Sequence, residues 1–554
     1  MTRVSAGTAA CQQNRNSAVS RLNLQSHGPG SSLLAHLSEV AGVATCFEER
    51  VVCVCHDIGK ATEEWQGYSN GQFKRNSPHQ HAFSGGLLAT ALLYELNISG
   101  AVSFESALVA LHVGPAHHSH LSMLNVAVFR QEISTVVSSP LAHRFFCDRE
   151  AGIASLLPTI PDKAFAAAWN HMHDLLSSSS SFWKQFSHSV AALSGQTRVK
   201  CFLDSRDLLG RLCWQDWQSA KVQSGDIQSL QSWESVFGFQ PHFQQRSAKD
   251  YGEATNDLQK FRADLRSAML DLVLGDAMPF YFLDAPTGLG KTEAMLAAAE
   301  SLVNDNSNDL SKIVFAVPRV SIGDQVMSDY LEGADAMIWN HLRRERAGGR
   351  TTSDEQSNLE LGTTLDILHH PFQTSYNVTT FNQVLYAICH PLRTLCVRSL
   401  GLRNAVVIMD EFHKLPFTSL PYFFRMAAAH YARTGCRFIF GSATPMPSTD
   451  YLGTLHWRSL PQKIRSRLQE HPAVDHRRIY RRVSDMTIED VGNWISTFEK
   501  ESETSLLVVL NLVGKGTWPL RKRFVGQYAP ERDVQLLENE EADRVTVFLD
   551  GLTP

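Results

Sequence analysis

Residues 280–296, FYFLDAPTGLGKTEAML, indicate the fold of the C-terminal part of the chain. An apolar run typical of a β-strand leads into a glycine-rich loop, and a helical pattern follows, which is the context of a P-loop with alanine in its first position. Gly288 and Gly290 let the backbone curl so that its N–H groups face phosphate oxygens. Lys291 is predicted to reach the β- and γ-phosphates of ATP, and Thr292 is predicted to bind Mg²⁺.

Two later segments complete this pattern. VVIMDEFHKLP, from Val406, is an apolar run that ends in Asp410, which is suited to hold Mg²⁺ through water, and Glu411, which is suited to orient the attacking water. FIFGSATP follows, and hydroxyls of Ser442 and Thr444 at a strand end can couple the nucleotide state to a neighbouring lobe. The order of the three segments predicts a nucleotide-hydrolysing unit.

The same part of the chain alternates β-rich runs with helical or loop segments. This alternation predicts a parallel sheet with helices on both faces. A helix is expected at 258–273, before the P-loop strand. The predicted strands are residues 280–284, 312–317, 405–410, 437–442 and 505–511.

APTGLGKT, DEFH and SAT resemble motifs I, II and III of superfamily 2 helicases, in the same order. FAVPRVSIGDQVM, from Phe315, resembles motif Ia, and NVTTFNQVLYAI, from Asn377, resembles the TTxxQ-type segment. In that family the two segments grip the backbone of one DNA strand. The resemblance implies DNA-binding roles for Pro318, Arg319, Thr379 and Thr380.

Basic residues cluster near 343–346 and again between 458 and 482. A solvated face is the ordinary interpretation of such runs, and a DNA path is the alternative.

The N-terminal part is helical in pattern from Ser31 to about Lys221 and is rich in histidine. Imidazole and carboxylate groups are the mixed ligands that divalent transition metals prefer. HMHD, at residues 171–174, lies in an ordinary amphipathic pattern and is interpreted as a satisfied or exposed cluster. The candidate ligands stand in five separated pieces, which are His36, the dipeptide His56-Asp57, His79 or His81, the pair His117-His118, and Asp216.

These pieces resemble the HD phosphohydrolase superfamily, and specifically the nuclease domain of the helicase-nuclease family of type I CRISPR interference. The resemblance implies a two-metal site suited to phosphodiester hydrolysis, occupied by manganese, cobalt, nickel or iron. His56 and Asp57 would be catalytic, and Lys60 would contact a phosphate. His112 and His120 are interpreted as structural or supporting. One metal would be held by His36, His56, Asp57 and Asp216, and a second by Asp57, His81, His117 and His118, with His79 as the alternative to His81.

Bulk properties exclude several classes. The chain has 554 residues and a net charge of -5, so it is not a basic nucleic-acid coat as a whole. Its 10 cysteines form no CxxC pair, which argues against a zinc ribbon or a disulfide framework. No signal peptide and no apolar run of about 18 residues is found. A cytoplasmic protein without a membrane partner is expected.

The expected architecture is multidomain, with an all-α HD-type N-terminal domain, an α/β RecA-like helicase lobe and an incomplete second RecA-like lobe. SLLVVLN with Asn511 resembles motif IV, but the later arginine-bearing motif is not found, so the family pattern is interpreted as C-terminally truncated. Weak ATPase and no processive unwinding are expected, and a separate polypeptide that completes the helicase is a candidate partner. The predicted segments are a flexible lead-in at 1–30, the HD nuclease domain at 31–225, a linker at 226–255, the ATP-binding first lobe at 256–455 and the partial second lobe at 456–554.

The order of HD domain first and helicase second points to CRISPR interference. The resemblance implies a metal-dependent single-stranded DNA endonuclease coupled to an ATP-dependent 3′-to-5′ translocase, recruited by an RNA-guided, Cascade-type surveillance complex. One alternative is an HD nucleotidase with a vestigial motor, and another is a non-catalytic nucleic-acid-binding remnant. Cleavage of polymeric DNA, as against phosphate release from free nucleotides, separates the two enzymatic hypotheses.

Overall fold

The structure is a computed structural model of the whole chain. It describes residues 24–26, 31–71, 82–118, 121, 130–177, 179–225, 229–230, 243–247, 256–275, 277–285, 288–305, 307, 309–339, 344–346, 372, 374–415, 420–443, 455, 457–460, 478–481, 505–510 and 545–550.

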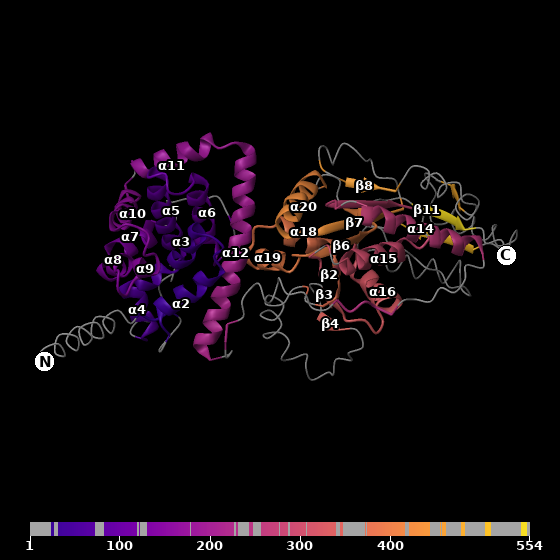
Figure 1. Cartoon of the computed structure of the whole chain (residues 1–554), viewed down its shortest axis with the longest axis horizontal. Coiled ribbons are helices and arrows are strands. Elements are labelled where there is room, and N and C mark those ends of the chain that lie inside the picture. The colour runs from indigo at the N-terminus through magenta and orange to yellow at the C-terminus, as the bar shows by residue number, and fades with distance from the viewer. Residues whose placement is uncertain are drawn as a thin grey trace, which may run out of the picture.

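The N-terminal part is a helical unit around one hydrophobic core, drawn in indigo to magenta in Figure 1. This confirms the helical N-terminal region predicted from the sequence. Its elements are α2 (Leu33–Val40), η1 (Ala41–Val43), α3 (Phe47–Cys55), η2 (Ile58–Ala61), α4 (Glu63–Ser69), α5 (Ala82–Ile98), α6 (Phe104–Ala116), α7 (Arg130–Ser138), α8 (Pro140–Cys147), α9 (Ile153–Leu156), α10 (Asp162–Asp174), α11 (Ser181–Ala192) and α12 (Gly195–Ser224).

Glycines bring the central helices into backbone contact. A Cβ atom on Gly114 of α6 would lie 2.1 Å from the Cα of Gly86 on α5, and a Cβ on Gly85 would lie 2.2 Å from the carbonyl oxygen of His56. Only glycine permits approach this close. The crossing therefore fixes α5 against both the end of α3 and the end of α6, where histidines of interest stand.

The α/β unit is built on an eight-stranded sheet of order β4-β3-β5-β2-β6-β7-β1-β8. Every pairing is parallel except that of β3 with β4, which confirms the predicted parallel-sheet domain. The strands are β1 (Phe280–Asp284), β2 (Lys312–Val317), β3 (Ala336–Trp339), β4 (Arg344–Arg346), β5 (Tyr376–Thr380), β6 (Ala405–Asp410), β7 (Arg437–Ser442) and β8 (Trp457–Ser459).

Helices cover both faces of this sheet. Tyr281 and Leu283 of β1 pack in one core, and Phe280 and Phe282 pack in the other, as the two-residue period of a strand requires. The first face is covered by α14 (Asp257–Gly275), α15 (Lys291–Asn304) and α16 (Val320–Tyr330), and the second by α18 (Phe381–Cys389) and α20 (Leu420–Thr434).

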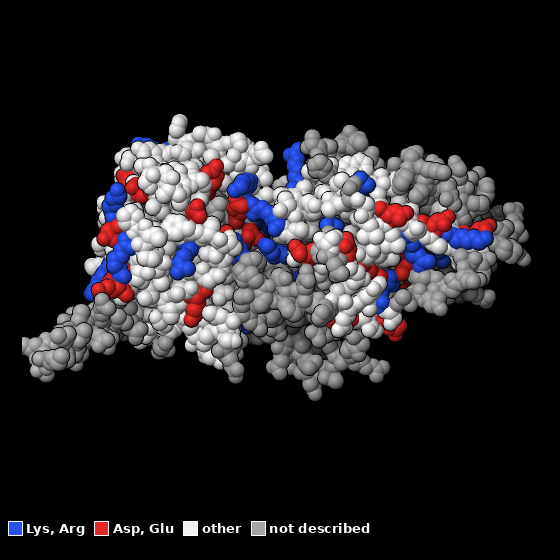
Figure 2. Space-filling view, in the orientation of Figure 1, with Lys and Arg blue, Asp and Glu red and all other residues white. Residues whose placement is uncertain are grey.

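The two units meet along α12, a helix of 30 residues that stands between them in Figure 1. Helix α19 (Arg393–Leu400) comes from the α/β unit, yet its Cys396, Val397 and Leu400 belong to the hydrophobic core of the helical unit. Figure 2 shows side chains of both charges gathered along this seam. Among the described residues, the ion pairs Arg403–Asp207, at 3.5 Å, and Arg433–Asp204 cross it.

The strands after the eight-stranded sheet form a separate sheet of order β10-β11-β9, from β9 (Arg478–Arg481), β10 (Ser505–Leu510) and β11 (Val545–Asp550). Both pairings are antiparallel. A RecA-like lobe is expected to have parallel strands, so the partial second lobe stays a prediction.

No helix in the described ranges has the length and apolarity that crossing a bilayer requires.

Candidate metal centre and nucleotide site

Four residues from three distant segments converge in the helical unit. His36 lies on α2, His56 and Asp57 follow α3, and Asp216 lies on α12. Their candidate ligand atoms all lie within 4.8 Å of one another, and all four side chains are buried. Nε2 of His36 lies 3.3 Å from both Asp57 Oδ2 and Asp216 Oδ1. The arrangement gathers two imidazoles and two carboxylates around one point.

Asp57 faces two groups of histidines with its two oxygens. Oδ2 lies 3.3 Å from His36 Nε2 and 3.4 Å from His56 Nε2, whereas Oδ1 lies 3.3 Å from His117 Nε2. Asp57, His117 and His118 form a second candidate ligand group, and the rings of the two histidines are 4.1 Å apart. A carboxylate placed in this way can bridge two cations.

Hydrogen bonds on the Nδ1 side orient the buried imidazoles. Nδ1 of His56 donates to the carbonyl of Cys53 at 2.7 Å, and Nδ1 of His117 donates to the carbonyl of Gly114. Since a carbonyl only accepts, Nδ1 carries a proton in each ring, and Nε2 is the nitrogen that faces Asp57. Metal-binding histidines usually donate their other ring N–H in this way, which fixes the orientation of the ring.

Nδ1 of His36 is linked to a carboxylate through a side-chain hydroxyl. Its Nδ1 lies 2.7 Å from Ser219 Oγ, and that hydroxyl donates to Glu39 Oε2 at 2.5 Å. Because the hydroxyl proton goes to the carboxylate, Ser219 accepts from the Nδ1–H of His36. Nε2 of His36 is therefore again the nitrogen that faces the carboxylates.

The local charges keep the carboxylates ionised. Burial opposes ionisation of Asp57, but Lys60, whose Nζ lies 2.6 Å away, and His56 lower the pKa of this carboxyl well below its ordinary value. Burial also opposes ionisation of Asp216, and hydrogen bonds from His36 and His56 lower its pKa. Burial disfavours charge on His56, yet the Coulombic effect of Asp57 and hydrogen bonds to Asp216 and Asp57 together outweigh it and raise the pKa of His56 to about 10. A metal ion that binds there must therefore displace a proton from this ring. Burial lowers the pKa of His117.

This donor set fits divalent transition metals. Neutral imidazole nitrogens and ionised carboxylate oxygens are the groups such ions take, and oriented histidines are what a preformed site requires. The first group offers the side chains of His36, His56, Asp57 and Asp216, and the second offers Asp57, His117 and His118.

The remaining predicted residues of this centre are distributed differently. His118 is exposed, which leaves its imidazole open to solvent or substrate. His79, His81 and His120 lie outside the described residues. His112 is half-buried, and its Nδ1 lies 3.4 Å from Ser205 Oγ rather than in the cluster. His171 of the HMHD segment contacts Glu95 Oε1 at 2.5 Å and stacks on Phe182, so it has a structural role.

The nucleotide motifs meet at the carboxyl ends of neighbouring strands. The P-loop follows β1, the DEFH segment follows β6, and Ser442 ends β7, which lies between them. Thr292 Oγ1 donates to Asp410 Oδ2 at 2.8 Å, so the two predicted Mg²⁺ residues are already in contact. Lys291 is buried, with Nζ 3.9 Å from Glu411 Oε1.

Backbone conformation shapes this site. Gly288 and Gly290 have φ values of +80° and +79°, in the region that glycine occupies without strain. Glu411 has a φ of 61°, which is uncommon for a residue with a side chain and is typical of functional sites. Arg262 of α14 donates to the carbonyl of Gly288 at 2.7 Å, which ties the loop to the preceding helix.

His413 connects two of the motifs. Its Nδ1 lies 3.0 Å from Ser442 Oγ and 3.4 Å from Glu411 Oε2. The geometry therefore links the DEFH and SAT segments directly. Thr444, the other residue predicted for coupling, lies outside the described residues.

The predicted DNA-gripping residues differ in exposure. Arg319 is exposed and Pro318 is half-buried, at the start of α16, whereas Thr379 and Thr380 are buried at the end of β5. Of the four, Arg319 is the exposed residue, so its side chain can contact a phosphate. Of the basic runs, the side chain of Arg458 is described, and it is half-buried on β8.

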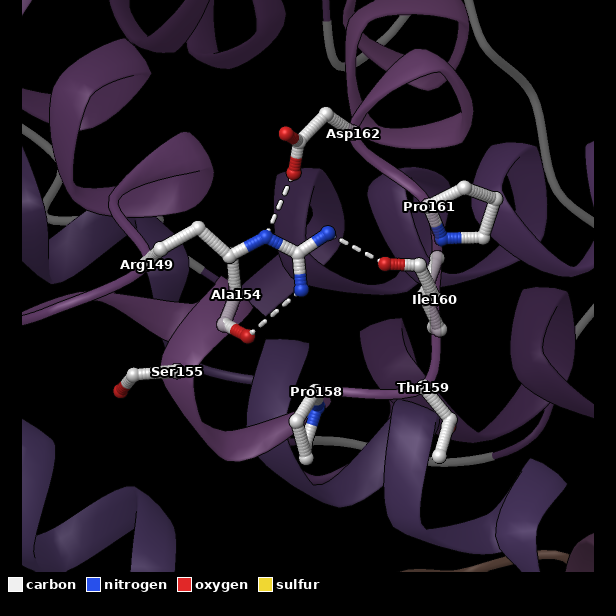
Figure 3. A pocket seen from close by; sticks show the side chains of 8 residues that line it. All are labelled: Arg149, Ala154, Ser155, Pro158, Thr159, Ile160, Pro161 and Asp162. Carbon is white, nitrogen blue, oxygen red and sulfur yellow. Dashed lines mark hydrogen bonds and ion pairs between the residues drawn. The ribbon is translucent and has the colours of Figure 1, made fainter.

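A hollow of about 540 Å³ lies elsewhere in the helical unit, lined by residues between Arg149 and Asp162. Figure 3 shows the guanidinium of Arg149 pointing at Asp162, Ala154 and Ile160. Its Nε contacts Asp162 Oδ1 at 2.5 Å, and its other nitrogens donate to the carbonyls of Ala154, Leu157 and Ile160. Arg149 thus holds a loop together, and the hollow contains none of the candidate metal or nucleotide residues.

Sequence reasoning missed several supporting residues. Ser219 stands three positions after Asp216, and Glu39 stands three after His36, so helical spacing was a usable signal for both. Arg246 contacts Glu293 Oε1 at 2.6 Å and Glu300 Oε1 at 2.7 Å on the P-loop helix. No local sequence pattern predicts this role for Arg246.

Comparisons with known proteins agree with these motifs. Residues 252–446 match the family model of the type III restriction enzyme res subunit. A CRISPR-associated nuclease/helicase Cas3 of Haloferax volcanii is 24% identical over 443 residues, covering 69% of this chain and 45% of that protein. A CRISPR-associated endonuclease/helicase Cas3 of Escherichia coli K12 is 27% identical over 161 residues, covering 26% of this chain and 18% of that protein.

Among solved structures, T. fusca Cas3 with ATP has a TM-score of 0.41 and 15% identity, and the match covers 76% of this chain and 50% of that one. The chain thus spans about half the length of the first relatives it matches. The curated relatives confirm the resemblance predicted from the motifs, to the nuclease/helicases of CRISPR systems.

Proposed function

We propose that this chain, similar to Cas3 nuclease/helicases over 69% of its length, is a metal-dependent single-stranded DNA endonuclease joined to an ATP-dependent DNA motor. The observation that carries the proposal is the placement of Asp57, whose Oδ2 faces His36 and His56 while its Oδ1 faces His117. Two adjacent ligand groups that share one carboxylate are what two-metal phosphodiester hydrolysis uses.

In the nuclease, the first ion would be held by His36, His56, Asp57 and Asp216, and the second by Asp57, His117, His118 and His81. Such a metal pair, when bound, supplies an activated water and neutralises the leaving oxygen. The residues of the chain hold these ligands in place, because Nδ1 of His36, His56 and His117 is fixed by Ser219 or by backbone carbonyls. Lys60, beside Asp57, would contact a phosphate of the strand.

In the motor, Lys291 would bind the β- and γ-phosphates, and Thr292 and Asp410 would hold Mg²⁺. Glu411 would orient the attacking water. The contact between His413 and Ser442 would pass the state of the nucleotide from the DEFH segment to the SAT segment. Together with Arg319 and Pro318 on the DNA side, this supports translocation on one strand, which we propose runs from 3′ to 5′.

The partners of this activity would be single-stranded DNA and an RNA-guided surveillance complex of the Cascade type. The complex would open the target and present the displaced strand to the metal centre. The support for this partnership is the similarity to proteins named CRISPR-associated nuclease/helicases. A cytoplasmic location follows from the proposal.

The test is cleavage of circular single-stranded DNA with Mn²⁺, Co²⁺ or Ni²⁺, by the native chain and by Asp57→Ala. A circle has no ends, so linear product identifies an endonuclease. We expect the native chain to cut and Asp57→Ala to fail, while Lys291→Ala, altered only in the nucleotide site, still cuts without ATP. Absence of cutting with every metal would reject the nuclease. Phosphate release from free nucleotides in its place would favour the nucleotidase alternative.

A further inference from the structure

The metal centre is in direct contact with the α/β unit. Arg393, the first residue of α19, donates from Nη1 to the carbonyl oxygen of His117 at 2.7 Å. The N–H of Leu121, four residues after His117, donates to the carbonyl of Pro391 at 3.0 Å. The backbone that carries His117 and His118 is therefore held from the nucleotide-binding side of the molecule.

The position of this carbonyl gives the contact its strength. His117 caps the C-terminal end of α6, where helix carbonyls lack intrahelical partners and a cation is favoured by the helix dipole. The guanidinium of Arg393 supplies both a donor and a positive charge there. Cys213 Sγ of α12 also lies 3.6 Å from the same oxygen, so His117 is held between α12 and α19.

The turn that carries Arg393 is itself fixed to the helical unit. Arg206 of α12 donates to the carbonyls of Ala387, Ile388 and His390 at the end of α18. A Cβ on Gly210 would lie 2.5 Å from the carbonyl oxygen of Cys396, so α12 and α19 touch through their backbones. The backbone around Arg393 is thus held by α12, so Arg393 can set the position of His117.

We propose that Arg393 is a positioning residue for the nuclease centre, which makes the second metal group a joint construction of the helical and α/β units. Through the carbonyl of His117, Arg393 sets the place of the His117 and His118 imidazoles. The inference rests on the proposed function, since it assigns a role within the two-metal site. It also connects the metal centre to the segment predicted to grip DNA. Helix α18, which leads to the turn that carries Arg393, begins directly after Thr380 in that segment.

The experiment is a titration of the full chain with Mn²⁺, following free Mn²⁺ by electron paramagnetic resonance. Arg393→Ala is expected to weaken binding of the Mn²⁺ ion at the second ligand group by about tenfold or more, the usual effect of removing a residue that supports a ligand, while the other ion binds as before. Arg393→Lys, which keeps a charged donor, is expected to restore most of the affinity. The matched control is Arg403→Ala, which removes another contact between the same two units, to Asp207, away from the metals.

Unchanged Mn²⁺ affinities in Arg393→Ala would overturn the inference, and so would an equal loss in Arg403→Ala, which would indicate general loosening of the seam. Should Arg393→Ala not fold, Arg393→Gln, which keeps much of the side-chain bulk, decides by the same criterion. Binding of fewer than two Mn²⁺ ions by the native chain would also overturn it. If the native chain binds two ions but does not cut DNA, the proposed function is rejected. The Mn²⁺ affinities of Arg393→Ala then still decide whether Arg393 positions the second ligand group.

Discussion

Ser219 stands between His36 and a carboxylate: its Oγ accepts from Nδ1 of His36 at 2.7 Å and donates to Glu39 Oε2 at 2.5 Å. The chain places an acidic group behind an imidazole of the candidate metal centre through one hydroxyl, where many metal sites have a direct contact. Such support raises the basicity of the ligand and fixes its ring.

Ser219→Ala is expected to weaken binding of the first Mn²⁺ by about 10- to 100-fold, because it removes the acceptor for His36 Nδ1. Equilibrium titration with Mn²⁺ measures this. Ser205→Ala is the control, since Ser205 is also buried on α12 but its hydroxyl donates to the carbonyl of Cys201. Equal losses in both variants would show that α12 tolerates no cavity and would contradict a specific role for Ser219.

Gly85→Ala is expected to destabilise the helical unit by about 1–3 kcal/mol, because the added Cβ would lie 2.2 Å from the carbonyl oxygen of His56. The strain falls on the segment that carries His56 and Asp57, so Mn²⁺ affinity should fall as well. Thermal unfolding and the Mn²⁺ titration measure the two effects. Gly42→Ala is the control, since a Cβ there meets nothing within 4 Å. A Gly85→Ala protein as stable as Gly42→Ala would show that α5 can move away without cost.

Lys312 gives the α/β unit a pH dependence. It is buried on β2, with Nζ 3.2 Å from the carbonyl of Gly401, and burial lowers its pKa to about 8. The unfolded chain holds this proton up to a pKa of about 10.4, so the stability contributed by this residue rises with pH between about 8 and 10.4. At pH 7 the buried charge costs up to about 3 kcal/mol.

Lys312→Met is therefore expected to raise the unfolding temperature at pH 7, and the gain should shrink at pH 9.5. Scanning calorimetry at the two pH values measures it, with the exposed Lys414→Met as the control. A gain independent of pH would mean that burial does not lower the pKa of Lys312 in the folded chain.

The local parts of the fold could be predicted from the sequence, because strand, loop and helix signals lie within a few residues of one another. The strands at 280–284, 312–317, 405–410 and 437–442 are present as predicted. The gathering of His36, His56, Asp57 and Asp216 was implied by a family pattern, since no local signal relates α2 to α12.

Contacts between distant elements could not be predicted in this way. The hydrogen bond from Arg393 to His117 joins residues far apart in the chain and depends on how two units pack. The burial of Thr379 and Thr380 is of the same kind, because sheet packing on both sides, rather than the local sequence, decides it. Sequence pattern thus identifies the chemistry, and packing decides which residues support it.

The hydrogen bond from Thr292 to Asp410 predicts how Mg²⁺ contributes to nucleotide binding. The two oxygens are 2.8 Å apart, and burial raises the pKa of Asp410. Thr292→Val keeps the shape of the side chain but removes the hydroxyl, so the predicted Mg²⁺ position loses one ligand and Asp410 loses its donor. Hydrogen bonds to charged groups contribute about 1.5–3 kcal/mol, which corresponds to roughly a tenfold to hundredfold loss of MgATP affinity.

Titration of the Thr292 variants with a fluorescent ATP analogue, once with Mg²⁺ and once with EDTA, measures the effect. We expect Thr292→Val to bind equally weakly in both conditions and Thr292→Ser to retain the Mg²⁺ dependence. If Thr292→Val still responds to Mg²⁺, the ion is held without this hydroxyl, and Asp410 alone must carry it.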